Sequence, residues 1–186
     1  PAHKHYEKVS GPEIKKTIGI ADEIWCPSEY LINRMKDINP NIKYRLIPNT
    51  LHEKEEQWKD IEKKPTDVVR FGYVGANGHQ EDMKAMGGVT LEGTESYCMG
   101  LMNYMDVLKA KHKLMHQYGS LYKEFDVSIS PLLNNKFNRC KSELKVIEAG
   151  YTKTAIIASN VSPYKQVIKH NKTGILCSTP GDWRKA

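Results

Sequence analysis

The sequence predicts an α/β fold in which helices cover a mostly parallel, doubly wound sheet. Short apolar segments with the length of strands alternate with amphipathic segments along most of the 186 residues, and this alternation is typical of parallel sheets. Proline and glycine recur between these segments, where turns are expected. A hydrophobic content of 39% and an aromatic content of 9% fit a globular chain rather than a disordered one.

The first fifty residues predict a helix, a strand, a second helix and a second strand. Ser10-Gly-Pro-Glu13 matches a capping box with proline in the first turn, so a helix is expected to begin there. An apolar run at 24–28 predicts a buried strand, and 29–37 has the apolar side of a helix. Partial alternation at 42–48 predicts the second strand.

Residues 52–67 differ from both neighbouring regions because they are dense in Glu and Lys and end near Pro65. Such a change of composition is typical of a linker. We therefore predict three parts: an N-terminal α/β part at 1–50, a linker at 51–67 and a second α/β domain at 68–186.

The second domain is expected to begin with a strand at 68–75 that runs into a glycine-bearing turn. Strands and helices then alternate to the end of the sequence. Further strands are expected at 89–92, 113–115, 126–130, 155–159 and 174–177. Helices are expected at 118–125, 140–150 and 163–170, and Asp182-Trp183 resembles the start of another.

A few conspicuous side chains are interpreted as structural. Trp25 and Trp58 are expected to pack against other residues. Met99, Met102 and Met105 have helical spacing and are expected to fill a core or a domain interface.

The charge of the chain predicts an acidic partner. The formal net charge is +6, which fits phosphorylated small molecules, anionic lipid or nucleic acid. Four cations, Lys136, Arg139, Lys141 and Lys145, lie within ten residues that contain one acid, Glu143. The other Lys and Arg residues are interleaved with acids, and there is no repeat of aromatic and basic residues. A local anion site is therefore favoured over a nucleic-acid footprint.

The four cysteines are far apart in the sequence and form no Cys-x-x-Cys pair. Neither a zinc site nor a disulfide framework is indicated, so no metal is expected and a reducing cytoplasm is the expected location. No apolar run reaches the roughly 20 residues of a membrane span, and nothing resembles a signal peptide. Peripheral association with a membrane is left open.

The predicted helix at 140–150 is a candidate anion site. Lys141, Lys145 and Glu148 are spaced at i, i+4 and i+7, which places their head groups on one helical face. The start of a helix offers free N–H groups and the positive end of the dipole, and Glu148 could accept hydrogen bonds from sugar hydroxyls. The alternative is a solvated Lys/Glu face, which spacing alone favours.

The turn Gly75-Ala-Asn-Gly-His79-Gln-Glu-Asp82 is a second candidate because it follows a strand, where open α/β sheets bind ligands. Glycine lets the backbone approach a phosphate closely, and His79 could donate a hydrogen bond to a diphosphate. The alternative is an ordinary strand-to-helix turn that Asn77 or Asp82 caps.

The order of these motifs resembles the GT-B-fold glycosyltransferases, in particular the large retaining family that uses nucleotide-sugar donors. The resemblance covers nearly the whole chain. It is carried by 21–31 with Ile47-Pro-Asn49, Phe71-Gly-Tyr-Val-Gly75 with His79 and Asp82, Asp126-Val-Ser-Ile-Ser-Pro-Leu132, and Lys141-Ser-Glu-Leu-Lys-Val-Ile-Glu-Ala-Gly150.

The resemblance implies a role for each matching residue at the donor. Glu148 would bind the ribose hydroxyls, Gly75 would admit the phosphates, and Lys141 and Lys145, with Arg139 as an outside candidate, would hold the diphosphate. No catalytic residue is assigned, and His79 and Lys141 are the candidates.

The sequence departs from the family at Cys140, which stands where many members have a second acid near the transferred sugar. Asn138 or Ser142 are the candidates to orient the sugar instead. By the same resemblance, 1–50 would be the last part of the N-terminal, acceptor-side domain and 68–186 the nucleotide-sugar-binding domain.

The implied activity is transfer of a sugar from a nucleoside-diphosphate sugar to a hydroxyl of a glycan, lipid-linked or protein acceptor, as in polysaccharide biosynthesis. Retention of configuration is expected, without metal or other cofactor. The chain alone could be an inactive part of the enzyme. The alternatives are a non-catalytic nucleotide-sugar-binding module, a nucleotide-sugar 2-epimerase and a basic nucleic-acid-binding domain.

Overall fold

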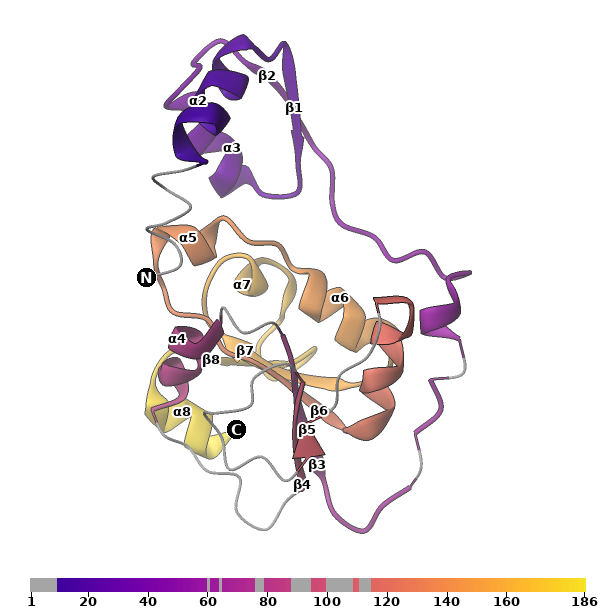
Figure 1. The fold of residues 1–186 in the computed structure, drawn as a ribbon. Helices are drawn as coiled ribbons and strands as arrows, with labels where there is room; N and C mark the ends of the chain where they lie inside the picture. Colours follow the sequence, from indigo (N-terminus) through magenta and orange to yellow (C-terminus); the bar gives the residue numbers. More distant parts are fainter. Residues whose placement is uncertain are drawn as a thin grey trace.

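The computed structural model describes residues 10–59, 61–63, 65–75, 79–87, 95–99, 109–110 and 115–186. It contains a two-stranded sheet, β1-β2, and a six-stranded sheet in the order β5-β4-β3-β6-β7-β8. Every pair of neighbouring strands in both sheets is parallel. Figure 1 shows the two sheets as separate bodies, with the N-terminal part on the side of α5. The predicted parallel α/β class is confirmed.

The N-terminal part has the predicted order of elements: α2 (Gly11–Ile20), β1 (Glu23–Cys26), α3 (Glu29–Lys36) and β2 (Lys43–Leu46). The predicted capping box at Ser10 is wrong, because Ser10 is itself in a helical conformation and its side chain makes no capping hydrogen bond. The side chain that does cap a helix here is Ser28, whose hydroxyl accepts from the N–H of Leu31 at 3.3 Å.

The strand predicted to be buried at 24–28 is only partly so. Cys26 is buried, whereas Trp25 is 66% exposed. The guanidinium carbon of Arg45 lies 5.8 Å from the centroid of the Trp25 ring. Side chains alternate across a strand, so Cys26 and Trp25 lie on opposite faces of the two-stranded sheet. The packing role predicted for Trp25 is therefore wrong in the described part of the chain.

The segment predicted to be a linker packs against the second sheet. Its 3₁₀ turn, η1 (Glu56–Trp58), places Trp58 in a core cluster at 6% exposure, edge-on to Tyr118 and Tyr151 with centroids 6.3 and 5.9 Å away. Lys63 donates to the Thr154 hydroxyl at 2.7 Å. The packing role of Trp58 is confirmed, and the domain boundaries stay predictions.

The second sheet is built from alternating strands and helices, with 3₁₀ turns between some of them. The strands are β3 (Arg70–Val74), β4 (Glu95–Met99), β5 (Lys109–Ala110), β6 (Val127–Ser130), β7 (Ala155–Ser159) and β8 (Ile175–Cys177). The helices and 3₁₀ turns are α4 (Gln80–Met83), η3 (Lys84–Met86), η4 (Met115–Glu124), α5 (Lys136–Arg139), α6 (Leu144–Tyr151), α7 (Tyr164–Val167) and α8 (Pro180–Lys185).

The strands predicted at 68–75, 126–130, 155–159 and 174–177 are confirmed. The strand predicted at 89–92 lies outside the described residues, and the strand predicted at 113–115 is wrong at Met115, which begins η4. Strand β4 was missed because its sequence, Glu-Ser-Tyr-Cys-Met, has no β-branched residue. Met99 ends this strand, so its helical interpretation is wrong; Met102 and Met105 lie outside the described residues.

The helix predicted at 140–150 is confirmed only from Leu144, where α6 begins; its first four residues, 140–143, instead connect α6 to the short helix α5. Asn135 caps α5 by accepting from the N–H of Asn138 at 2.8 Å. Lys141 therefore lies in the connection, and it does not share a helical face with Lys145 and Glu148.

Both faces of the second sheet are buried, as a doubly wound arrangement requires. One core cluster contains Val74, Ile156 and Ala158, and the other contains Tyr73 and Ile157. Neighbouring residues of one strand thus face opposite cores. Among the described residues no helix has the length and apolar character needed to cross a membrane.

Candidate functional site

The candidate site lies where β3 and β6 end. The two strands are parallel, so their carboxyl ends meet at one edge of the sheet, which is where open α/β sheets bind ligands. Gly75 directly follows β3, and a Cβ added to it would lie 2.2 Å from the Tyr73 hydroxyl oxygen. Only glycine fits at this position without displacing Tyr73.

Lys145 reaches from α6 to this edge. Its Nζ donates to the carbonyl oxygen of Val74, the last residue of β3, and lies 5.2 Å from the Tyr73 ring centroid. Burial lowers the pKa of Lys145 to about 8, while the nearby Glu148 carboxylate acts in the opposite direction. The ammonium is thus still mostly protonated near neutral pH. Lys145 and Gly75 are brought together as predicted.

Glu148 is buried one helical turn from Lys145. Two tyrosine hydroxyls donate to the same oxygen, Oε2: Tyr118 at 3.1 Å and Tyr122 at 2.8 Å. Burial raises the pKa of both tyrosines well above the usual range, and the Glu148 carboxylate adds to this effect. Both remain neutral donors, and they hold Glu148 in place. Within the described residues, Oε1 accepts no hydrogen bond.

Asp82 is the centre of a second cluster. Its Oδ1 accepts from the Asn138 side chain at 2.5 Å and the Leu133 N–H at 2.9 Å, and its Oδ2 pairs with His79 Nδ1 at 2.9 Å and Lys141 Nζ at 3.4 Å. Burial by itself would raise the pKa of Asp82, but these hydrogen bonds and the Lys141 charge outweigh it and lower the pKa. Asp82 therefore stays ionised and fixes both His79 and Lys141.

The cation of Lys141 is also partly withdrawn from water. Burial lowers the pKa of Lys141, and the carboxylate of Asp82 counteracts this effect. Lys141 Nζ lies 3.4 Å from His79 Nδ1. Because His79 meets Asp82 through Nδ1, its Nε2 is the nitrogen left for a ligand, and donation from Nε2 requires a protonated ring.

Asn138 has a structural place in this cluster. It is buried, and its amide nitrogen donates both to Asp82 and to the Leu133 carbonyl, the latter at 2.9 Å. Ser142 is half-buried in the connection between α5 and α6. The sugar-orienting role of either residue stays a prediction.

Arg139 does not join the other predicted diphosphate ligands. Its Nε donates to the Asn134 side chain at 2.7 Å, and its guanidinium lies 6.0 Å from the Tyr30 ring centroid in the N-terminal part. Cys140, beside it, turns its thiol to the Lys136 carbonyl at 3.2 Å. Arg139 and Lys141 thus have different partners in the structure, although they are only two positions apart in the sequence.

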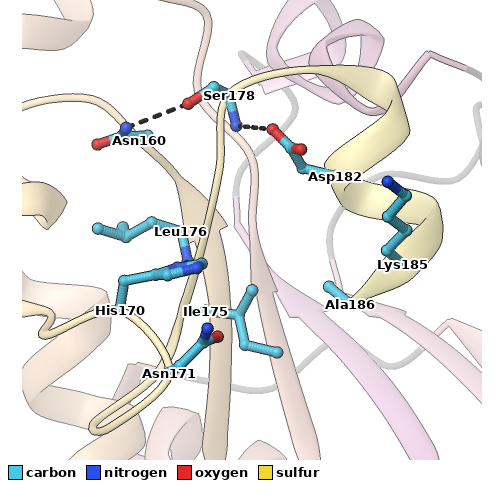
Figure 2. A pocket seen from close by; sticks show the side chains of 9 residues that line it. All are labelled: Asn160, His170, Asn171, Ile175, Leu176, Ser178, Asp182, Lys185 and Ala186. Atoms are coloured by element: carbon cyan, nitrogen blue, oxygen red, sulfur yellow. Dashed lines mark hydrogen bonds between the residues drawn. The ribbon is translucent and has the colours of Figure 1, made fainter.

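A hollow beside β8 and α8, of about 450 Å³, is distinct from this site. Figure 2 shows that polar groups at its wall bind one another: Asn160 donates to the Ser178 hydroxyl at 3.1 Å, and Asp182 accepts from the Ser178 N–H at 2.8 Å. His170 accepts from the Leu176 N–H at 3.0 Å. These pairs hold the turn before α8. The helix expected at Asp182-Trp183 begins at Pro180, and the Thr179 side chain caps it by accepting from the Asp182 N–H.

Two residues of the site were missed from the sequence. Tyr118 and Tyr122 are four positions apart and precede a buried strand, which was the available signal that both point to one side of a helical turn. No pattern in the sequence relates them to Glu148. In the described residues, no group of three or more His, Cys, Asp or Glu side chains is arranged to hold a metal ion.

Comparison with solved structures identifies the fold. Sucrose-phosphate synthase from Thermosynechococcus elongatus matches with a TM-score of 0.63 and 16% identity over 91% of this chain and 48% of that chain. The lipopolysaccharide outer core galactosyltransferase WaaB matches with a TM-score of 0.56 and 14% identity over 89% and 50%. The pneumococcal O-GlcNAc transferase GtfA, in complex with UDP and GlcNAc, matches with a TM-score of 0.54 and 10% identity over 91% and 38%.

No family model matches the sequence, and no curated protein matches it significantly. The chain spans half or less of each of these three structures. All three are GT-B glycosyltransferases, and the order of strands and helices described above is shared with them over about nine-tenths of this chain. The fold of this chain is therefore that of part of a GT-B glycosyltransferase.

Proposed function

We propose that this chain contributes the donor side of a glycosyltransferase that uses a nucleoside-diphosphate sugar. The observation that carries the proposal is the placement of Lys145 and Glu148. Lys145 meets the last carbonyl of β3 directly before Gly75, and Glu148 lies one turn deeper with Oε1 unbound among the described residues. A cation beside a glycine turn suits a diphosphate, and a fixed carboxylate suits the two hydroxyls of a ribose.

The chemistry would be departure of the nucleoside diphosphate as an acceptor hydroxyl attacks the anomeric carbon. The bond from that carbon to the diphosphate breaks, and the bond to the acceptor oxygen forms. Lys145 and Lys141 would stabilise the negative charge that grows on the leaving diphosphate, an effect worth several kcal/mol in comparable sites. Asp82 contributes indirectly because it fixes Lys141 and His79. We propose retention of configuration and a reaction without metal.

A second candidate function is a donor-binding module that transfers nothing. It is favoured by the contacts of Cys140 and Asn138. The thiol of Cys140 is directed to the Lys136 carbonyl, and the side-chain nitrogen of Asn138 donates to Asp82 and to the Leu133 carbonyl. Neither side chain is free to replace the second acid of the related enzymes. Binding and transfer therefore need separate measurements.

Donor binding is tested by a thermal-shift titration of the protein with a nucleoside diphosphate. A ligand that binds the folded state raises the melting temperature, and Lys141→Ala should abolish this shift. Lys36→Ala, on α3 of the N-terminal part, is the matched control and should leave it unchanged. An equal shift in wild type and Lys141→Ala would contradict the assignment of Lys141.

Transfer is tested by release of free nucleoside diphosphate from a nucleotide sugar. An acceptor-dependent release supports the transferase. Binding without acceptor-dependent release in the complete protein would favour the non-catalytic module. Tight DNA binding without a nucleotide effect would contradict both.

A further inference from the structure

A second pocket lies between the N-terminal part and the second sheet, outside the cluster of Lys141, Lys145 and Glu148. It has a volume of about 380 Å³, within the range of small-molecule sites. Its wall combines α3, the segment around α5 and the chain that follows β7. The residues used below are Glu29, Tyr30, Arg139, Asn160, Lys165 and Gln166. Figure 1 shows α3 on the side of α5, in agreement with the contact of Arg139 with Tyr30.

The charge of this pocket is positive. Arg139 uses its Nε to bind Asn134, which leaves its two terminal nitrogens without a hydrogen-bond partner among the described residues. Lys165 is exposed and forms no ion pair within the same residues. Among the described residues, Glu29 is the one acid of the wall, and it too forms no ion pair with any of them. The described wall of the pocket therefore contains two cations, Arg139 and Lys165, and one carboxylate, Glu29, that could bind a ligand.

The rest of the wall suits a hydroxylated ligand. Asn160 and Gln166 bring amide groups that can both donate and accept, and Glu29 can accept from hydroxyls. Tyr30 brings an aromatic ring, already beside the Arg139 guanidinium. This combination fits a sugar that also carries a negative group, because guanidinium and ammonium groups bind phosphate and carboxylate strongly.

We propose that this pocket binds the acceptor, and that Arg139 and Lys165 select an acceptor sugar bearing a phosphate or carboxylate. This inference rests on the proposed function, because the pocket can hold an acceptor only if the protein transfers a sugar. It moves Arg139 to the acceptor from the donor diphosphate, for which the family resemblance made it an outside candidate. Arg139 and Lys141 then serve different substrates, and Cys140 lies between them.

The proposal is tested by calorimetric titration of the full chain, with nucleoside diphosphate present, using glucose 6-phosphate, glucuronic acid and glucose. Wild type should bind an anionic sugar about tenfold more tightly than glucose, as expected for one or two charge-assisted hydrogen bonds. The anion that binds more tightly distinguishes phosphate from carboxylate. Equal affinity for the three sugars, or no binding of either anionic sugar, would overturn the proposal.

The variants Arg139→Gln and Lys165→Gln should remove this preference while leaving the thermal shift with nucleoside diphosphate intact. Lys169→Gln, exposed beyond α7 and outside the pocket wall, is the control. A loss of the nucleotide shift in Arg139→Gln would return Arg139 to the donor and overturn the inference. Absence of the nucleotide shift in wild type, with anionic sugar binding retained, would instead contradict the proposed function.

Discussion

The two sheets of this protein use similar side-chain pairs in opposite environments. In the N-terminal part, Arg45 and Glu23 join β2 to β1 at 2.6 Å, with side chains 66% and 31% exposed. In the second sheet, Arg70 binds Asp126 with two nitrogens at 3.0 and 2.9 Å, and the Arg70 side chain is 7% exposed. The first pair is screened by water, whereas the second lies largely in the protein.

The same contrast holds for the tryptophans, with Trp25 exposed and Trp58 buried. It also holds for the candidate chemistry, because Lys145, Glu148 and Asp82 all bind groups of the second α/β part: the Val74 carbonyl, the Tyr122 hydroxyl and the Leu133 N–H. Burial lowers the pKa of Lys145, whereas at Asp82 hydrogen bonds and the Lys141 charge outweigh the effect of burial and lower the pKa. We therefore expect the second sheet to carry both the stability of the described chain and its binding chemistry.

The largest expected effect comes from the tryptophans. Trp58→Ala removes a buried aromatic ring from a cluster with Tyr118 and Tyr151 and should lower the free energy of unfolding by about 3–5 kcal/mol. Trp25→Ala should change it by less than about 0.5 kcal/mol, because that ring is exposed. Denaturation in urea measures both values. Similar losses in the two variants would contradict the contrast between the sheets.

The ion pairs should follow with a smaller effect. Arg70→Met should cost about 2–3 kcal/mol, because it removes the guanidinium hydrogen bonds to Asp126 and leaves that carboxylate partly buried without them. Arg45→Met should cost less than about 1 kcal/mol, as for exposed pairs. Thermal unfolding of the two variants under the same conditions checks this, and a cost at Arg45 equal to that at Arg70 would refute it.

The buried ammonium of Lys145 predicts a pH dependence of donor binding. Its pKa of about 8 lies below the ordinary value for lysine, so the charge is mostly present at pH 7 and mostly lost at pH 9. If the charged form binds the diphosphate, the affinity for a nucleotide sugar should fall about tenfold between these pH values. The diphosphate diester of the nucleotide sugar does not titrate in this window.

The control for that experiment is Lys145→Arg, which keeps its charge at pH 9 and should show a flat profile. A wild-type affinity that is equal at pH 7 and pH 9 would remove Lys145 from the donor site. The stability of the unliganded protein is a separate readout. Because the folded pKa is depressed, the cost of burying the charge is present below about pH 8 and is relieved as pH rises toward the unfolded value.

The smallest expected effect is at Tyr122. Tyr122→Phe removes one of the two donors to Glu148 and should cost about 1 kcal/mol of stability, while Tyr118 still holds the carboxylate. Tyr44→Phe, on the exposed β2, should be neutral. Urea denaturation of the pair tests whether the hydroxyl of Tyr122 matters, and an unchanged midpoint in Tyr122→Phe would show that it does not.

The parallel strands were predictable where the sequence itself is periodic and apolar. Ala155–Ser159 is a continuous small and β-branched run, and it forms β7 with the predicted bounds. Glu95–Met99 has no such pattern and was missed, because its pairing with β3 comes from the sheet rather than from its own residues. The helix predicted at 140–150 begins four residues too early, because side-chain periodicity does not show that 140–143 connect α5 to α6.

The α/β class, the strand that leads to Gly75 and the position of Lys145 and Glu148 on one helix could all be derived from the sequence. These depend on spacing within one element, which local geometry fixes. The tertiary structure decided which charges meet: Asp82 with Lys141 and Asn138, Glu148 with Tyr118 and Tyr122, and Arg139 with Tyr30 rather than with the other cations. Such contacts join residues far apart in the chain. They follow from how the helices pack on the sheet, and burial there gives the side chains their chemistry.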